Sequence, residues 1–171
     1  MPKINSILIT PNPALDLLEY FSTQGLRLAT AESCTGGLVG TLMTAIPGSS
    51  AAYAGGFVTY TNQMKIDLLG VDPAQIGQYT EVSAPVAKAM AEGARARTGA
   101  DVAVSLTGVA GPGGGTEQIP VGTVYIGVST RVRTVSVRYC IPEYLPRHEI
   151  RSRAALLALT LALREARNLT I

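Results

Sequence analysis

The sequence is poor in the residues that build metal sites and disulfide scaffolds. Its 171 residues include two cysteines, Cys34 and Cys140, and a single histidine, His148. The cysteines lack metal-ligand spacing and a secretory context, so we predict free thiols in a reducing cytoplasm and neither a bound metal nor a cofactor. The histidine lies in a proline-rich approach to the last predicted helix, a poor place for the base of a Ser-His-Asp triad.

Charges and long hydrophobic runs are scarce as well. Charged residues make up 15% of the sequence and apolar residues 47%, which is typical of a well-buried globular protein. One long uncharged interval separates Glu32 from Lys65, but Pro47-Gly48 and Gly55-Gly56 interrupt it, so we expect no transmembrane helix and no membrane partner. The first residues show no basic segment leading into an apolar run, so we also expect no signal peptide.

The few charges are unevenly distributed. From Arg131 onward the chain has eight arginines and three glutamates, a net charge of +5, whereas the whole chain carries only +2. This basic tail favours an anionic partner such as a phosphate or a nucleic acid. It is equally compatible with the solvated face of a hairpin and a helix, which is the commoner outcome.

The order of the predicted elements indicates the fold class. The length predicts a single domain over residues 1–171, with residues 1–12 as a leader of uncertain structure. Strands that alternate with helices pair in parallel, and two final strands around a tight turn form a hairpin. We therefore predict an α/β protein with three α/β/α layers and a mixed, mostly parallel sheet of about five strands. Helices are predicted over residues 14–23, 38–46, 83–98 and 147–167, with short helical pieces near 62–69 and 73–76, and strands over 26–31, 54–61, 101–106, 120–130 and 133–141.

The stretch Ala31-Glu32-Ser33-Cys34-Thr35-Gly36-Gly37 joins the first predicted strand to a helix. A helix start leaves backbone N–H groups unpaired, and its dipole favours negative charge there. A serine at such a turn can attack a carbonyl while the free N–H groups stabilise the oxyanion. Ser33 is thus a candidate nucleophile, ranked above Cys34; from these residues alone, Ser33 or Thr35 serving only as a helix cap is the commoner role.

The next strand leads to Tyr60, Asn62 and Lys65. A lysine in an apolar, uncharged setting can lose its proton near neutral pH, and a Ser–Lys pair can replace Ser-His-Asp. Lys65 is therefore a candidate base for Ser33, although surface exposure is the usual fate of lysine.

A third segment, residues 107–116, is a glycine-rich loop after the third strand. It matches neither the phosphate-binding GxxxxGK[ST] motif nor the dinucleotide fingerprint, but its backbone N–H groups can approach an anion. Arg147 and Arg151, one helical turn apart, can clamp a phosphate or carboxylate, or can simply be solvated. Ligands bind beyond the carboxyl ends of parallel strands, so we expect all three segments to meet in one crevice.

These motifs together resemble the CinA C-terminal domain family, which includes nicotinamide-nucleotide amidohydrolases. The resemblance covers residues 15–163. It rests on residues 31–37 (AESCTGG), on residues 56–62 (GFVTYTN) with Lys65, and on residues 108–112 (GVAGP) followed by residues 120–124 (PVGTV).

The resemblance implies hydrolysis of the carboxamide of nicotinamide mononucleotide to nicotinic acid mononucleotide and ammonia, in pyridine nucleotide salvage. It places the nucleophile on Ser33, the general base on Lys65 and an assisting role on Tyr60. The residues that it suggests for substrate binding are Thr35, Gly36, Asn62, Thr107, Gly108, Gly111 and Arg147, with Arg151 a less certain match than Arg147.

The resemblance also implies the three-layer fold and leaves an alternative function open. The alternative is a non-catalytic, competence- or DNA-damage-associated module that binds nucleotides or nucleic acid, for which the basic tail is the independent support. Larger family members carry an N-terminal pyrophosphatase-type domain, for which we expect no room in these 171 residues. We expect a small-molecule pyridine nucleotide as substrate, no nucleic-acid partner, and a homo-oligomer.

Overall fold

The computed structural model describes residues 11–169, so that residues 1–10 of the predicted leader lie outside the described part. Six α-helices, one short 3-10 helix (η1) and five strands follow one another in this range. Their order is α1 (Pro13–Gln24), β1 (Leu28–Glu32), α2 (Leu38–Thr44), η1 (Ser49–Ala51), β2 (Tyr53–Val58), α3 (Asn62–Leu69), α4 (Pro73–Tyr79), α5 (Ala84–Thr98), β3 (Val102–Gly108), β4 (Thr123–Thr130), β5 (Thr134–Cys140) and α6 (Arg147–Arg167).

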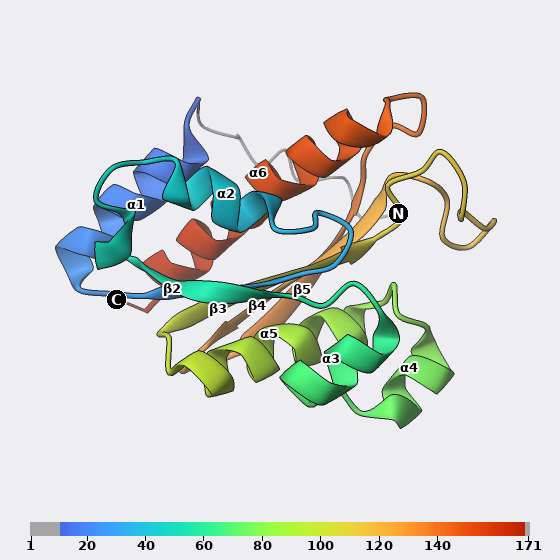
Figure 1. The fold of residues 1–171 in the computed structure, drawn as a ribbon, viewed down its shortest axis with the longest axis horizontal. Coiled ribbons are helices and arrows are strands. Elements are labelled where there is room, and N and C mark those ends of the chain that lie inside the picture. Colours follow the sequence, from blue (N-terminus) through green and yellow to red (C-terminus); the bar gives the residue numbers. More distant parts are fainter. Residues whose placement is uncertain (1–10, 170–171) are drawn as a thin grey trace.

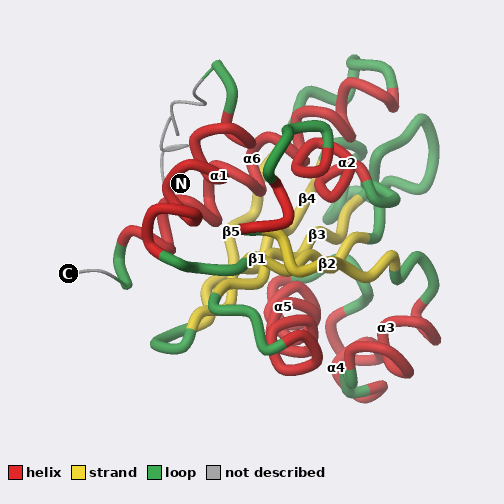
Figure 2. The backbone as a smooth tube through the Cα atoms, turned by 60° about the vertical axis from the view of Figure 1, so that its left-hand side comes forward, coloured by secondary structure: helices red, strands yellow, loops and turns green. Residues whose placement is uncertain are grey.

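The five strands form one mixed sheet in the order β2-β1-β3-β4-β5. β1 is parallel to both β2 and β3, whereas β4 is antiparallel to β3 and to β5. Helices α1, α2 and α6 cover one face and α3, α4 and α5 the other, so the predicted three layers are confirmed (Figures 1 and 2). The carboxyl ends of β1, β2 and β3 consequently lie at the same edge of the sheet, at the right in Figure 1.

Alternating side chains divide the sheet between two cores. Leu28 on β1 and Val104 on β3 join the core beneath α1, α2 and α6, whereas Ala29 and Ala103, their neighbours in sequence, join the core beneath α5. All five residues of β1 are buried, as expected for a central strand covered on both faces. The near-continuous apolar run of β3 is thus explained, as predicted, by burial on both faces of the sheet.

Helix α5 approaches the sheet very closely because the strands beneath it carry small residues. The Oγ atom of Ser105 on β3 donates to the carbonyl of Ala87 on α5 at 2.5 Å. A Cβ atom added to Gly127 on β4 would lie 2.4 Å from the same carbonyl oxygen. The alanine-rich sequence of α5 fits this contact, since it adds little bulk on the helix side.

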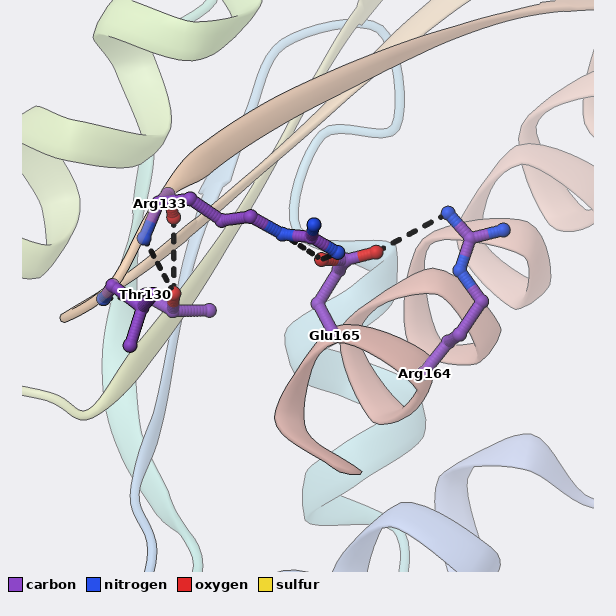
Figure 3. Close-up of polar contacts among 5 residues, drawn as sticks. Thr130, Arg133, Arg164 and Glu165 are labelled. Atoms are coloured by element: carbon purple, nitrogen blue, oxygen red, sulfur yellow. Dashed lines mark hydrogen bonds and ion pairs between the residues drawn. The ribbon is translucent and has the colours of Figure 1, made fainter. Parts of the chain in front are cut away.

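An ion pair joins the β4–β5 turn to helix α6. The carboxylate of Glu165 is 2% exposed and accepts from Arg133 at 2.7 Å, while Arg164 lies 3.3 Å from its other oxygen (Figure 3). Thr130 accepts from the backbone N–H of Arg133 at 3.1 Å and closes the turn. One arginine of the basic tail, Arg133, therefore anchors the last helix to the hairpin, whereas the contact of Arg164 with Glu165 lies within that helix.

Most element bounds agree closely with the sequence prediction, and the differences occur at both helix and strand ends. The helix predicted over 38–46 ends at Thr44, the piece predicted near 73–76 extends to Tyr79, and the short helix η1 was not predicted. The predicted strand 54–61 ends already at Val58, because the chain then turns into α3 and the carbonyl of Thr59 accepts from Lys65. The predicted strand 120–130 begins only at Thr123, after Gly122 with its positive φ of 87°. No helix in the described range is both long and apolar enough to cross a membrane.

Candidate active site

The three segments predicted to converge do meet, in a pocket of about 410 Å³ at the carboxyl edge of the parallel strands. The turn after β1 contributes Ser33, the segment after β2 contributes Lys65, and the glycine loop after β3 closes the far side. This arrangement follows from the parallel pairing of β1 with both of its neighbours. The lining residues are Ser33, Cys34, Tyr60, Thr61, Asn62, Lys65, Glu81, Val82, Thr107, Gly108, Val109, Ala110, Gly111, Gly113, Gly114 and Arg147.

Ser33 and Lys65 are in direct contact at the base of this pocket. The Nζ atom of Lys65 lies 3.2 Å from the Oγ atom of Ser33, and it also donates to the carbonyl oxygens of Thr59 at 3.0 Å and Tyr60 at 3.4 Å. Ser33 is 8% exposed and Lys65 only 1%. Lys65 is thus a buried lysine beside a hydroxyl, and the surface position usual for lysine does not apply.

Burial is also the main influence on the protonation of Lys65. Desolvation lowers the pKa of its amine below the ordinary value, while the negative charge of Glu81 acts in the opposite direction. The salt bridges of the described residues do not include Lys65. Burial shifts the amine towards its neutral form because an ammonium ion in this position loses contact with water and gains no salt bridge in return.

Sequence reasoning missed the role of Glu32. Its contacts correct the expectation that the backbone N–H groups at the start of α2 are unpaired. Its carboxylate is 1% exposed and accepts from the backbone N–H groups of Gly37 at 3.0 Å, Val39 at 3.1 Å and Gly40 at 2.9 Å. The start of α2 is therefore not a free set of donors, as its position after a strand suggested, since an internal carboxylate already binds it. The two residues that directly follow the serine, Cys34 and Thr35, have backbone N–H groups that donate to no other residue in the described range.

Arg151 acts on the same turn from helix α6. Its Nε atom donates to the carbonyl of Cys34 at 3.2 Å and its Nη2 atom to that of Thr35 at 2.6 Å. Arg151 does not line the pocket, and neither do the predicted substrate-binding residues Thr35 and Gly36. The hydroxyl of Thr35 is buried and, among the described residues, has no hydrogen-bond partner. Glu32 and Arg151 thus hold the serine turn from its N–H side and from its carbonyl side.

Arg147 lies at the mouth of the pocket and joins two of its walls. It donates to the carbonyl of Gly111 in the glycine loop at 2.7 Å and to the hydroxyl of Tyr60 at 3.2 Å. The side chain of Tyr60 is 60% exposed. Its hydroxyl contacts Arg147, while its backbone carbonyl is the group that accepts from Lys65.

The remaining predicted binding residues line the pocket too. Asn62 is the first residue of α3, and Gly108 is the last residue of β3. The hydroxyl of Thr107 donates to the carbonyl of Glu81 at 2.7 Å, so that it fixes a neighbouring segment. Glu81 itself lines the pocket and was not anticipated, because nothing in the sequence links the loop after α4 to the carboxyl edge of the sheet.

Cys34 lies next to the serine but is a poor nucleophile. Its side chain is buried, and desolvation raises the pKa of the thiol to about 11. The reactive thiolate is therefore rare at neutral pH. No group of three or more His, Cys, Asp and Glu side chains in the described range is arranged to hold a metal ion.

Comparison with known proteins gives matches over almost the whole chain. The model of the "CinA C-terminal domain" family matches residues 12–166. A CinA-like protein of Chlorobaculum tepidum is 50% identical over 146 residues, which cover 82% of this chain and 34% of that protein. A putative competence-damage inducible protein of Symbiobacterium thermophilum is 54% identical over 110 residues, which cover 64% of this chain and 26% of the relative.

Solved structures agree with this architecture. The competence/damage inducible protein CihA of Agrobacterium tumefaciens has a TM-score of 0.83 at 39% identity, covering 93% of this chain and 94% of that one. A CinA superfamily protein of Escherichia coli has a TM-score of 0.84 at 32% identity, covering 95% and 94%. The chain thus spans the length of these solved proteins, but only about a third of the length of the curated Chlorobaculum relative, 34%.

Proposed function

Because the chain belongs to the CinA C-terminal domain family, we propose that it is an amidohydrolase that converts nicotinamide mononucleotide to nicotinic acid mononucleotide and ammonia. The reaction runs through an acyl-enzyme on Ser33, with Lys65 as the base. The single observation that carries the proposal is the buried Lys65 amine, 3.2 Å from the Ser33 hydroxyl and inside a pocket. A structural helix cap at Ser33 would need no such amine.

The surroundings of Lys65 suit it to accept a proton from the serine. A neutral amine has two N–H groups and one lone pair. The carbonyl oxygens of Thr59 and Tyr60 take the two N–H groups, at 3.0 and 3.4 Å, and the lone pair then faces the hydroxyl of Ser33. Burial lowers the pKa of the amine and so increases the share of the neutral form, which is the form that acts as a base.

The proposed reaction has two halves. In the first, Lys65 takes the proton of Ser33, the Oγ atom attacks the carboxamide carbon, and the proton passes from Lys65 to the leaving nitrogen as the C–N bond breaks. In the second, Lys65 takes a proton from water, the hydroxide attacks the ester carbon, and Ser33 recovers its proton as the ester bond breaks. The net change consumes one water and releases ammonia and a carboxylic acid.

The tetrahedral intermediates in both halves carry an oxyanion that needs donors. We assign this role first to the backbone N–H group of Cys34, a residue that lines the pocket, and second to that of Thr35, which follows it outside the pocket lining. Neither N–H donates to another residue in the described range. Arg151 fixes the carbonyl of Cys34, and the peptide bond that contains it also contains the N–H of Thr35. Because carbonyl and N–H of a trans peptide point in opposite directions, Arg151 sets the direction of that donor.

The substrate phosphate is assigned to the mouth of the pocket. Arg147 and the backbone of the glycine loop, including Gly108 and Gly111, supply donors there. Tyr60 assists by forming the wall that Arg147 contacts, and Asn62 supplies an amide at the start of α3. In this arrangement the carboxamide points to the base of the pocket and the phosphate to solvent.

The alternative of nucleic-acid binding has less to support it. All eight arginines of the basic tail have an intramolecular contact, and three of them, Arg133, Arg153 and Arg164, pair with carboxylates. The eight arginines are Arg131, Arg133, Arg138, Arg147, Arg151, Arg153, Arg164 and Arg167.

An ammonia-release assay tests the proposal. Purified wild type is incubated with a panel of pyridine nucleotides beside Ser33→Ala, with circular dichroism to confirm that the variant is folded. We expect ammonia from nicotinamide mononucleotide with the wild type, and a loss of at least about a thousandfold in the variant, as for other lost nucleophiles. Undiminished ammonia release by folded Ser33→Ala contradicts the assignment.

A further inference from the structure

Thr80 has a backbone conformation that is nearly restricted to glycine. Its φ is 65° and its ψ is 164°, and among the described residues it is the one non-glycine with positive φ. A β-branched side chain in this region costs on the order of 1–3 kcal/mol, and such strain clusters at functional sites. The position therefore calls for a reason beyond the end of helix α4.

Three hydrogen bonds hold this segment in place. The N–H of Thr80 donates to Ile76 at 2.9 Å, the hydroxyl of Ser83 donates to the carbonyl of Thr80 at 2.9 Å, and Thr107 of β3 donates to the carbonyl of Glu81 at 2.7 Å. The last of these ties the segment to the strand that bears the glycine loop. The result is that residue 81 is presented to the pocket.

Glu81 is the single acidic side chain among the residues that line this pocket, which also include the basic residues Lys65 and Arg147. No ion pair of the described residues involves it. Glu81 is exposed to solvent and lines the pocket, and its negative charge raises the pKa of Lys65 against the effect of burial. This acid is unfavourable for the proposed base, because it opposes the loss of a proton from Lys65, so its presence is not explained by tuning of that residue.

The charge of the proposed substrate offers an explanation. Nicotinamide mononucleotide carries a positive pyridinium ring next to the carboxamide and a negative phosphate at the other end. Arg147 beside the glycine loop complements the phosphate, and Glu81 complements a cation bound near Lys65. The pocket lining thus supplies one group of opposite sign for each charge of the substrate, Arg147 for the phosphate and Glu81 for the ring.

We propose that Glu81 is a specificity-determining residue that favours substrates with a cationic ring over neutral rings of the same shape. This inference rests on the proposed function and adds to it the electronic state of the ring that the site selects. Glu81 contacts the ring electrostatically and takes no part in bond making. Reduced, uncharged dihydropyridine nucleotides are disfavoured for the same reason.

Binding to an inactive enzyme separates this role from catalysis. In a Ser33→Ala background, calorimetry measures the affinity for nicotinamide mononucleotide and for its neutral isostere, in which a benzamide ring replaces the pyridinium. The substitution Glu81→Gln removes the charge and leaves the backbone carbonyl that Thr107 holds. The matched control is Glu19→Gln, an exposed position on α1 across the sheet.

We expect Glu81→Gln to weaken the cationic ligand by about three- to tenfold and to leave the neutral ligand unchanged, as for one partly solvated charge pair. Glu19→Gln should change neither. An equal effect on both ligands, or no effect on either, overturns the inference.

Failure of the proposed function is recognised separately. If wild type releases no ammonia, the hydrolysis is wrong whatever the affinities are. If ammonia release is normal but the ratio of the two affinities is the same with Glu81 and with glutamine, the role of Glu81 is wrong and the hydrolysis stands. If Glu81 acted solely through Lys65, Glu81→Gln would shift the pH profile of ammonia release and leave that ratio unchanged.

Discussion

The amine of Lys65 reaches the hydroxyl of Ser33 across 32 positions of sequence, at an Nζ–Oγ distance of 3.2 Å. Ser33 follows a central strand and Lys65 belongs to the helix that follows the adjacent edge strand. Parallel pairing of β1 and β2 therefore assembles the pair. The first predictions concern the two consequences of that burial, for activity and for stability.

We expect ammonia release by the wild type to rise with pH and to level off below the pKa of an ordinary lysine, 10.5. The neutral form of Lys65 is the base, and an unperturbed lysine would be only about 0.1% neutral at pH 7.5. Desolvation raises this fraction by lowering the pKa. The pH dependence of kcat/KM checks this, and a rate that falls as pH increases from 6 to 9 contradicts it.

The same lysine is expected to lower stability at neutral pH. The unfolded chain binds the Lys65 proton more tightly than the folded one, so stability rises with pH between the lowered folded pKa and 10.5. Lys65→Met should abolish ammonia release, raise the free energy of unfolding at pH 7 by about 1–2 kcal/mol, and reduce its rise with pH. Urea unfolding at pH 7 and pH 9 measures both; the exposed Lys88→Met on α5 is the control.

Glu32 is expected to be needed for both the fold and the reaction. Glu32→Gln places an amide where three backbone N–H groups converge, and removes the charge at the start of α2. We expect a loss of about 3 kcal/mol in the free energy of unfolding and a lower kcat, because the serine turn loses one of its two supports. Glu19→Gln on α1 should leave the free energy of unfolding nearly unchanged. Equal stability of the two variants would show that the negative charge of Glu32 does not stabilise the start of α2.

The convergence of Ser33, Lys65 and the glycine loop was predictable because it depends on topology alone. Alternating strands and helices determine which ends of the strands meet, and side-chain detail is not required. The burial of Lys65 was less predictable, because the uncharged interval that precedes it suits a buried lysine while surface exposure is the usual fate of this residue type.

Residues that act through long-range contacts were not predictable. Glu32 reads in sequence as one charge within a strand-to-helix turn, and its partners are backbone groups that carry no sequence signal. Arg151 was considered as a phosphate ligand, but the structure places it on the carbonyls of Cys34 and Thr35. Glu81 enters the pocket through a backbone conformation at Thr80 that its residue type argues against.

Cys34 should react with maleimide far more slowly than Cys140. Burial raises the pKa of the Cys34 thiol to about 11, which leaves roughly 0.01% thiolate at pH 7, whereas Cys140 is exposed. Mass spectrometry of tryptic peptides after a short exposure at pH 7 locates the label. Cys140→Ser should remove the fast labelling; fast labelling that persists in this variant would mean that Cys34 is reactive.

The close approach of α5 to the sheet predicts a large effect of one methyl group. Gly127→Ala would place its Cβ atom 2.4 Å from the carbonyl oxygen of Ala87, and relief requires the helix to move. We expect a loss of about 2–3 kcal/mol in the free energy of unfolding. Gly77→Ala, on α4 with open space around the added atom, should instead stabilise by about 0.5–1 kcal/mol. Similar thermal midpoints for the two variants would contradict the tight contact.

We expect a threonine-to-glycine substitution to raise the free energy of unfolding at position 80 and to lower it at position 23. Thr80→Gly removes strain worth about 1–3 kcal/mol and adds about 0.5–1 kcal/mol of unfolded-chain freedom, so we expect a net gain of about 1 kcal/mol. Thr23→Gly, in the last turn of helix α1, should lose about 0.3–0.5 kcal/mol, the difference in helix propensity between the two residues. Urea unfolding compares the two directly. A Thr80→Gly variant that is destabilised like Thr23→Gly would mean that the threonine is not strained.

Glycine at position 80 also loosens the segment that presents Glu81. We therefore expect the more stable Thr80→Gly to show a higher KM for the cationic mononucleotide, and an unchanged KM would contradict the argument that the conformation of Thr80 serves the pocket.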